Sequence, residues 1–156
     1  MTVGIQQLIW AVEKLATAFH EAVYDTRDLD AALATVGDEC VLENVPAGTG
    51  AGDRAALARY LADDVLPHLP DDLPFRRVSR TSDQRRVVQE SVVAFTHDRE
   101  LPWLLPGVAA THRRAEVLAV SIVGFRHRST RGVTESRIVA HRTLWDHTGL
   151  LARLTG

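Results

Sequence analysis

The sequence predicts an α+β domain in which helices come first and a β-sheet follows. Three observations carry this: a length of 156 residues, helical periodicity up to about residue 65, and alternating apolar runs after Pro74. A chain of this length forms about one domain with a single core. Hydrophobic residues make up 46% and charged residues 24%, which is typical of an ordinary globular protein. We therefore expect one domain over residues 1–156.

Three helices are expected in the first half of the chain. Apolar side chains recur at helical spacing over residues 5–25, which predicts a long amphipathic helix. Asp28 is placed to cap a second, short helix that ends near Gly37. Asp53 is placed to cap a third helix, which Pro67 ends because proline cannot continue a helix.

The second half reads as an antiparallel meander. The segment 40–45 predicts a first strand, and the glycine-rich segment 46–52 predicts a flexible loop. Four apolar, β-branched runs follow, at residues 75–80, 86–97, 115–127 and 134–145. Residues 117–125 are apolar on both alternating faces, so both faces need a cover. Helices can cover one, and we expect a second copy of the chain to cover the other, giving a homodimer.

Composition excludes several kinds of function. The net charge is −2, and the arginines are scattered in pairs without interleaved aromatic residues, so nucleic-acid binding is not expected. No run approaches the ~20 apolar residues of a membrane span. Cys40 is the only cysteine, so no intrachain disulfide forms, and we expect a cytoplasmic protein. The histidines lack metal-ligand spacing and the glycines lack a phosphate-loop lysine. Neither metal nor cofactor is expected.

The segment "FTHDRELPWLLPG", beginning at Phe95, is the strongest candidate for a reaction centre. Strand alternation places His97 on the same face as Phe95, pointing inward beside Trp103 in a lid-like segment. An imidazole there can exchange protons near neutral pH. The alternative is a strand-end histidine that bonds a backbone carbonyl. Arg99 has the same parity and could hold a carboxylate, although a local ion pair at the strand end is the plainer interpretation.

Asp146 is a second candidate catalytic residue. It follows Trp145 at the end of the last long strand, and a carboxyl group half-buried beside an indole should have a raised pKa, as a general base needs. The alternative is that Asp146 caps the following turn. The faces of this strand are equally apolar, so the alternation does not show whether His141 or Arg142 points inward.

Three further polar residues are candidates for ligand binding. His20 and Tyr24 lie four residues apart on the first helix and should touch, either at the edge of a cavity or as a surface pair. Asn44 precedes a turn, where it could orient a ligand or bond its own backbone.

Longer motifs resemble a known family. "ENVPAGTGAG", "VSRTSDQRRVVQESVVAFTHDRELPWLLPG" and "LWDH" look like the SnoaL-like domains found alone or fused to dienelactone hydrolases. These belong to the cone-shaped superfamily of nuclear transport factor two, ketosteroid isomerase and the SnoaL-like polyketide cyclases. The similarity runs from about Val41 to Trp145. Two places depart from it: His112 replaces a glycine, and Ala140 to Arg142 replace an acid and paired histidines.

The resemblance implies a curved antiparallel sheet wrapped around the N-terminal helices, with an internal cavity for a small molecule. The superfamily contains isomerases, dehydratases, hydrolases, cyclases and pure binders, so fold alone does not select a function. We expect a cofactor-independent acid-base enzyme for a small apolar or aromatic-derived substrate, with His97 and Asp146 exchanging protons. The alternative is a non-catalytic ligand-binding or accessory module.

Overall fold

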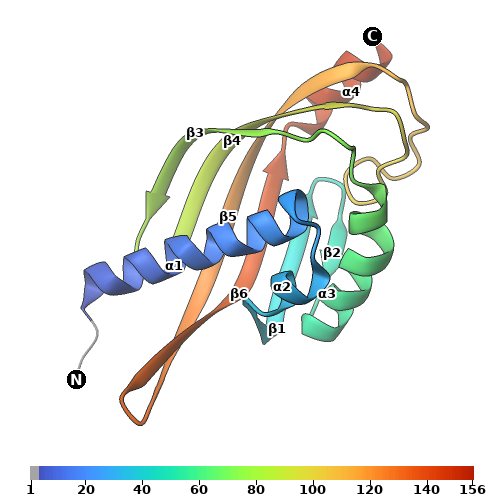
Figure 1. Cartoon of the computed structure of the whole chain (residues 1–156). Helices are drawn as coiled ribbons and strands as arrows, with labels where there is room; N and C mark the ends of the chain where they lie inside the picture. Colours follow the sequence, from blue (N-terminus) through green and yellow to red (C-terminus); the bar gives the residue numbers. More distant parts are fainter. Residues whose placement is uncertain (1–3) are drawn as a thin grey trace.

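A computed structural model describes residues 4–156, which form one curved sheet with helices packed on it (Figure 1). The six strands are ordered β2-β1-β6-β5-β4-β3. The expected meander is present, and its members are β3 (Phe75–Ser82), β4 (Arg86–Thr96), β5 (Arg114–Thr130) and β6 (Val133–Trp145). β1 (Val36–Val45) pairs with the far edge of β6, and β2 (Thr49–Ala51) pairs with β1.

The sheet is mixed and open, which corrects the expectation of a wholly antiparallel one. β1 runs parallel to β6. Val41 lies opposite Ala140, and the pairing continues without a shift to Val45, which lies opposite Leu144. β1 follows the N-terminal helices in the chain, and its partner β6 comes only at the end of the meander. Single-strand patterns carry no information on this long-range pairing.

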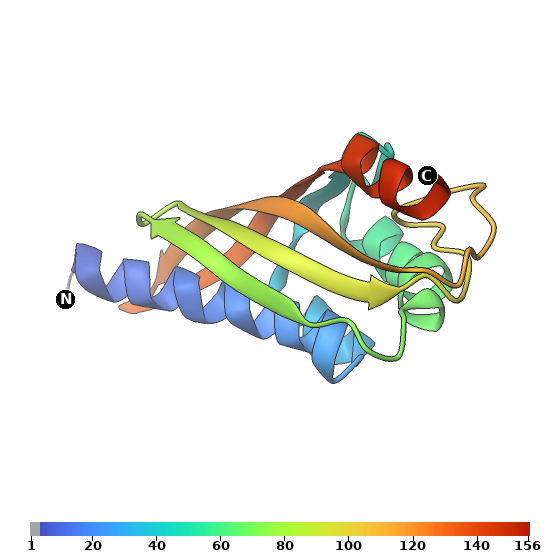
Figure 2. The same ribbon diagram turned by 90° about the horizontal axis from the view of Figure 1, so that it is seen from above.

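The helices lie on both sides of the sheet. Those of the N-terminal half are α1 (Ile5–His20), α2 (Leu29–Leu33) and α3 (Arg54–Tyr60). α1 continues into a π-helical turn, η1 (Glu21–Asp25), and α3 continues into η2 (Leu61–Val65) and η3 (Leu66–His68). α1 crosses one face of the sheet, whereas α4 (His147–Thr155) lies on the other side (Figure 2).

The expected helix caps are present. The carboxylates of Asp28 and Asp53 accept hydrogen bonds from the backbone N–H groups of Ala31 and Ala56. Gly37 does not end the second helix, however. The helix stops at Leu33, and the chain enters the sheet earlier than expected because Val36 pairs with Ile138 of β6.

The segment expected to be a flexible loop contains strand β2. Gly50 lies opposite Glu43 of β1 with φ of +150°. A Cβ atom there would lie 1.9 Å from the Leu42 carbonyl oxygen, so only glycine allows this close pairing.

The sheet has one face covered by α1 and one largely uncovered. On the α1 side, β4 and β5 bury alternate residues such as Phe95, Val117 and Val123, as the alternation of the sequence predicts. On the opposite side, Val88 and Leu118 are 36% and 42% exposed. Among residues 4–156, no helix is both long enough and apolar enough to cross a membrane.

Candidate functional site

A cavity of about 330 Å³ lies between the α1–η1 helix and the inner face of strands β3 to β6. Its size suits a small organic molecule. The helix contributes polar and acidic side chains to one wall. The strands contribute apolar, hydroxyl, amide and imidazole groups and the guanidinium groups of Arg77 and Arg80 to the other. The lining residues used below are His20, Tyr24, Phe75, Ser121, His141 and Thr143.

His20 and Tyr24 form the helix side of the cavity, as one of the two interpretations of this pair expected. Their ring centroids are 4.9 Å apart, and Phe75 of β3 packs against both, at 4.5 Å and 4.7 Å. The last residue of α1 supplies His20 and the π-helical turn supplies Tyr24. Such turns are often found at functional sites.

His141 lies opposite, on the strand side. The structure resolves the ambiguity of β6: His141, Thr143 and Trp145 line the cavity, whereas the Arg142 side chain lies near Glu43, with Nε 3.6 Å from the carboxylate. The His141 ring packs on Phe19 with centroids 5.0 Å apart. Burial lowers the pKa of His141 to about 4, and the neighbouring His20 contributes to the shift.

The side chains of His20, Tyr24 and His141 are all neutral near pH 7. Burial lowers the pKa of His20, an effect that the charges of Asp25 and Glu21 partly offset. Burial also raises the pKa of Tyr24, with a smaller contribution from Tyr60, so the phenol keeps its proton. Two neutral imidazoles and one neutral phenol thus face the same space, which is a combination that can accept and donate protons.

A smaller inner chamber of about 20 Å³ adjoins the cavity and shares Tyr24, His141 and Thr143 with it. Trp103 and Asn44 also line this chamber. Trp103 therefore lies at the inner end of the site, and the segment around it is buried core rather than the expected lid over the opening.

Asn44 holds the inner wall together rather than bonding its own backbone. Its side-chain oxygen accepts a hydrogen bond from Trp145 Nε1 at 2.9 Å, and its nitrogen donates to the Tyr60 hydroxyl at 3.0 Å. Tyr60 donates to Thr49, whose hydroxyl donates to the Trp103 carbonyl at 2.6 Å. The chain of donors fixes the Trp145 indole and the Trp103 backbone, and the two indole rings pack with their centroids 5.8 Å apart.

His97 is buried on the same side of the sheet as Phe95, but it is not among the residues that line the cavity or the inner chamber. Its Nδ1 lies 3.0 Å from the Thr111 hydroxyl and accepts from the Thr111 backbone N–H at 3.3 Å. Its own carbonyl accepts from Thr111 and His112. His97 thus closes the loop between β4 and β5, and its position gives no support to the expected catalytic role.

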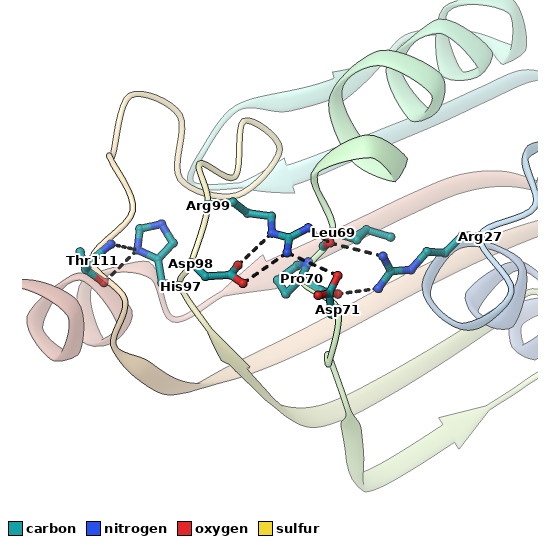
Figure 3. A network of polar contacts seen from close by, with 8 residues as sticks. All are labelled: Arg27, Leu69, Pro70, Asp71, His97, Asp98, Arg99 and Thr111. Atoms are coloured by element: carbon teal, nitrogen blue, oxygen red, sulfur yellow. Dashed lines mark hydrogen bonds and ion pairs between the residues drawn. The ribbon is translucent and has the colours of Figure 1, made fainter.

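The Arg99 guanidinium group bonds to other groups of the protein (Figure 3). It donates to the Leu69 carbonyl at 2.9 Å and pairs with Asp98 at 2.8 Å and Asp71 at 3.4 Å. Arg27, from the turn after η1, also donates to the Leu69 carbonyl. The two guanidinium groups fasten the segment after α3, which is the ion-pair interpretation of Arg99 rather than carboxylate binding.

Asp146 is exposed and caps α4, accepting a hydrogen bond from the Gly149 backbone N–H at 3.1 Å. It is not among the residues lining the cavity. Asp146 is thus a helix cap, which was the alternative interpretation of the sequence. Of the nine residues expected at a site, it brings six to the cavity or the inner chamber: His20, Tyr24, Asn44, Trp103, His141 and Trp145.

Several hydroxyl and amide groups of the cavity went unnoticed in the sequence. Gln89, Ser91, Ser121 and Thr143 all line it or its inner chamber. The sequence pattern that could have identified them is a polar residue at an inward position of an otherwise apolar strand. Ser91, which lies two residues before Val93 on the same face, is an example.

Comparison with solved structures agrees with this architecture. No family model and no curated protein matches the sequence. A protein named as a SnoaL-like polyketide cyclase from Shewanella denitrificans OS-217 superposes with a TM-score of 0.68 at 13% identity, covering 91% of this chain and 95% of the other. A protein with a ketosteroid isomerase-like fold from Catenulispora acidiphila, crystallised with trimethylamine, gives 0.62 at 14% identity, covering 90% and 91%.

A third structure is IdmH, named as a polyketide cyclase, from Streptomyces antibioticus. Its TM-score is 0.61 at 21% identity, with 92% of this chain and 98% of the other covered. The chain therefore has the fold of the SnoaL-like and nuclear transport factor two-like proteins, as the sequence motifs predicted. Identities this low define the fold and leave the chemistry to be argued from the site.

Proposed function

We propose that the protein binds a small, largely apolar molecule in this cavity and catalyses proton transfer on it without a cofactor. The observation that carries the proposal is the convergence of His20, Tyr24 and His141 on one cavity of about 330 Å³. All three side chains are partly exposed to this space. Their polar atoms can therefore bond a ligand or water there.

The environments assign a role to each residue. Asp25 and Glu21 offset part of the burial effect that lowers the pKa of His20, whereas no acidic residue in the described part of the chain raises that of His141, so we assign His20 as the general base. Tyr24 stays protonated and donates a hydrogen bond to an oxygen of the substrate. His141, with a pKa of about 4, stays neutral and orients the ligand.

An isomerase or cyclase step on a carbonyl compound suits these roles. Removing a proton next to a carbonyl group needs a base and a donor to the oxygen, and His20 and Tyr24 supply them. The names of the structural neighbours point to the same reaction classes.

Exchange of the α-protons of 1-tetralone in D₂O, followed by proton NMR, tests this proposal. We expect the protein to accelerate the exchange, and His20→Asn to lose at least about a hundredfold of the acceleration, the usual contribution of a general base. His112→Asn is the control, because His112 is exposed and outside the cavity. Equal exchange by wild type and His20→Asn would contradict the proposal.

A non-catalytic ligand-binding module is the second candidate. It is favoured by the strand wall of the cavity, which carries imidazole, hydroxyl, amide and guanidinium groups but no carboxylate; the carboxylates that line the cavity, Glu13, Glu21 and Asp25, belong to the helix. In the same experiment, binding of 1-tetralone without accelerated exchange would support this alternative.

We also propose that two copies pair through the uncovered face of the sheet, and that the protein works in the cytoplasm. The pairing is supported by exposed apolar residues on several strands: Val88 on β4, Leu118 on β5 and Val41 on β1. The location is supported only by the single free, buried Cys40.

A further inference from the structure

Trp103, one of the residues that line the inner chamber, carries a buried donor without an acceptor. Trp103 is 1% exposed, and its indole Nε1 has no hydrogen-bond partner within residues 4–156. An indole N–H can only donate. Leaving such a donor unsatisfied in the interior is unfavourable, so a group outside the protein is expected to accept from it.

The chain holds Trp103 firmly in this place. The donor relay that starts at Trp145 ends on the Trp103 carbonyl, and the Trp145 ring packs against the Trp103 indole from β6. The indole therefore cannot turn toward another acceptor without breaking this packing. The only other buried side-chain atom without a partner in the described residues is His97 Nε2, which also acts as a donor because His97 Nδ1 accepts from a backbone N–H.

The volume limits what can occupy the chamber. About 20 Å³ accommodates roughly one water-sized group. Tyr24, His141 and Thr143 border both spaces, so a molecule in the cavity can extend one atom past them. The other chamber walls are mainly apolar side chains, including Val23 and Leu61, and they exclude a charged group that lacks a counterion.

We propose that the inner chamber is an acceptor subsite, in which Trp103 Nε1–H donates a hydrogen bond to a neutral carbonyl oxygen of the ligand. This inference rests on the proposed function, because it uses the same cavity. It narrows the ligand to molecules whose carbonyl group lies at the inner end and whose apolar body fills the space of about 330 Å³. A ketone should therefore bind more tightly than the hydrocarbon of the same shape.

The test compares 1-tetralone with tetralin, which differ in the carbonyl oxygen, in wild type and Trp103→Phe. We expect the variant to weaken 1-tetralone binding about five- to tenfold, the size of one neutral hydrogen bond. Tetralin affinity should change less than twofold. Trp10→Phe is the matched control, because Trp10 is 64% exposed. Equal loss for both compounds, or no loss for either, would overturn the subsite.

A second measurement needs no variant. In wild-type protein, 1-tetralone should move the Trp103 indole ¹⁵N–¹H resonance downfield, and tetralin should not. If the Trp103 resonance does not shift when either compound binds, a buried water alone fills the chamber. The subsite is then refuted, but the cavity site is not. If neither compound binds, the proposed function fails and the subsite fails with it.

Discussion

At the scale of single residues, burial without a charged partner determines the character of the site. His141 packs against Phe19 and lies near another imidazole, His20, instead of a carboxylate. Desolvation therefore favours its neutral form. The same effect keeps the Tyr24 phenol protonated. His141 and Tyr24 can thus exchange hydrogen bonds with a neutral ligand while carrying no charge themselves.

The low pKa of His141 predicts a loss of stability in acid. The unfolded chain binds a proton to this histidine below pH 6.5, whereas the folded chain does so only below about 4. Between these values the unfolded state binds more protons, so the free energy of unfolding falls as the pH falls. Over this window the loss is on the order of 2 to 3 kcal/mol.

Urea unfolding at pH 7 and pH 4.5 measures this effect. His141→Gln should reduce the difference between the two pH values, because its side chain does not titrate. A smaller slope remains, since burial also lowers the pKa values of His20 and His97. His112→Gln, altered at an exposed site, should behave like wild type. An unchanged pH difference in His141→Gln would show that His141 is not buried in its neutral form.

Asp146 is predicted to stabilise α4 and to take no part in ligand binding. Asp146→Ala removes the acceptor for the Gly149 N–H and should lower the free energy of unfolding by about 1 kcal/mol, as loss of a helix cap does. Asp53→Ala, which removes the equivalent cap of α3, is the comparison. Calorimetry with 1-tetralone should give the wild-type dissociation constant for both. A tenfold weaker affinity in Asp146→Ala alone would restore Asp146 to the site.

At the scale of elements, the uncovered face of the sheet is the feature that most needs an explanation. β4 pairs with β5 along the whole length of β4, and in this register Val88 lies opposite Ile122 while Leu118 lies opposite Val92. α4 packs against β5 and leaves Leu118 42% exposed. A second copy laid on this face would remove these side chains from water.

We therefore predict that Leu118→Arg separates the proposed dimer. Light scattering at micromolar concentration should give twice the chain mass of 17.2 kDa for wild type and the single mass for the variant. Val133→Arg, at an exposed apolar position at the start of β6, should stay dimeric. A wild-type protein with the mass of one chain would disprove the pairing.

At the scale of the whole molecule, local patterns predicted the elements but not their long-range arrangement. The alternation in β4 correctly placed Phe95 and His97 on the inner face, because one buried face forces a period of two. The same alternation could not place His97 relative to the cavity, since that depends on where α1 crosses the sheet. For β6 both faces looked alike, and only pairing with β1 and β5 oriented His141.

The candidate site shows the same limit. His20 and Tyr24 were found because helical spacing is local. The bond from Arg99 to the Leu69 carbonyl spans 30 residues, so sequence spacing could not predict it. The bond between Asp146 and Gly149 is local, and the sequence had offered this cap as an alternative. Motif resemblance gave the superfamily fold, which no local pattern could have given.

The central claim is that His20 and His141 meet a ligand inside the cavity, and histidine ring NMR tests it most directly. Protein labelled with ¹⁵N in its seven histidines should be titrated with 1-tetralone at pH 7. The account predicts that the ring resonances of His20 and His141 shift together to saturation, while those of the exposed His112 and of His127, bonded to Ser136, stay unchanged. A bound ligand that leaves both His20 and His141 unshifted would contradict it.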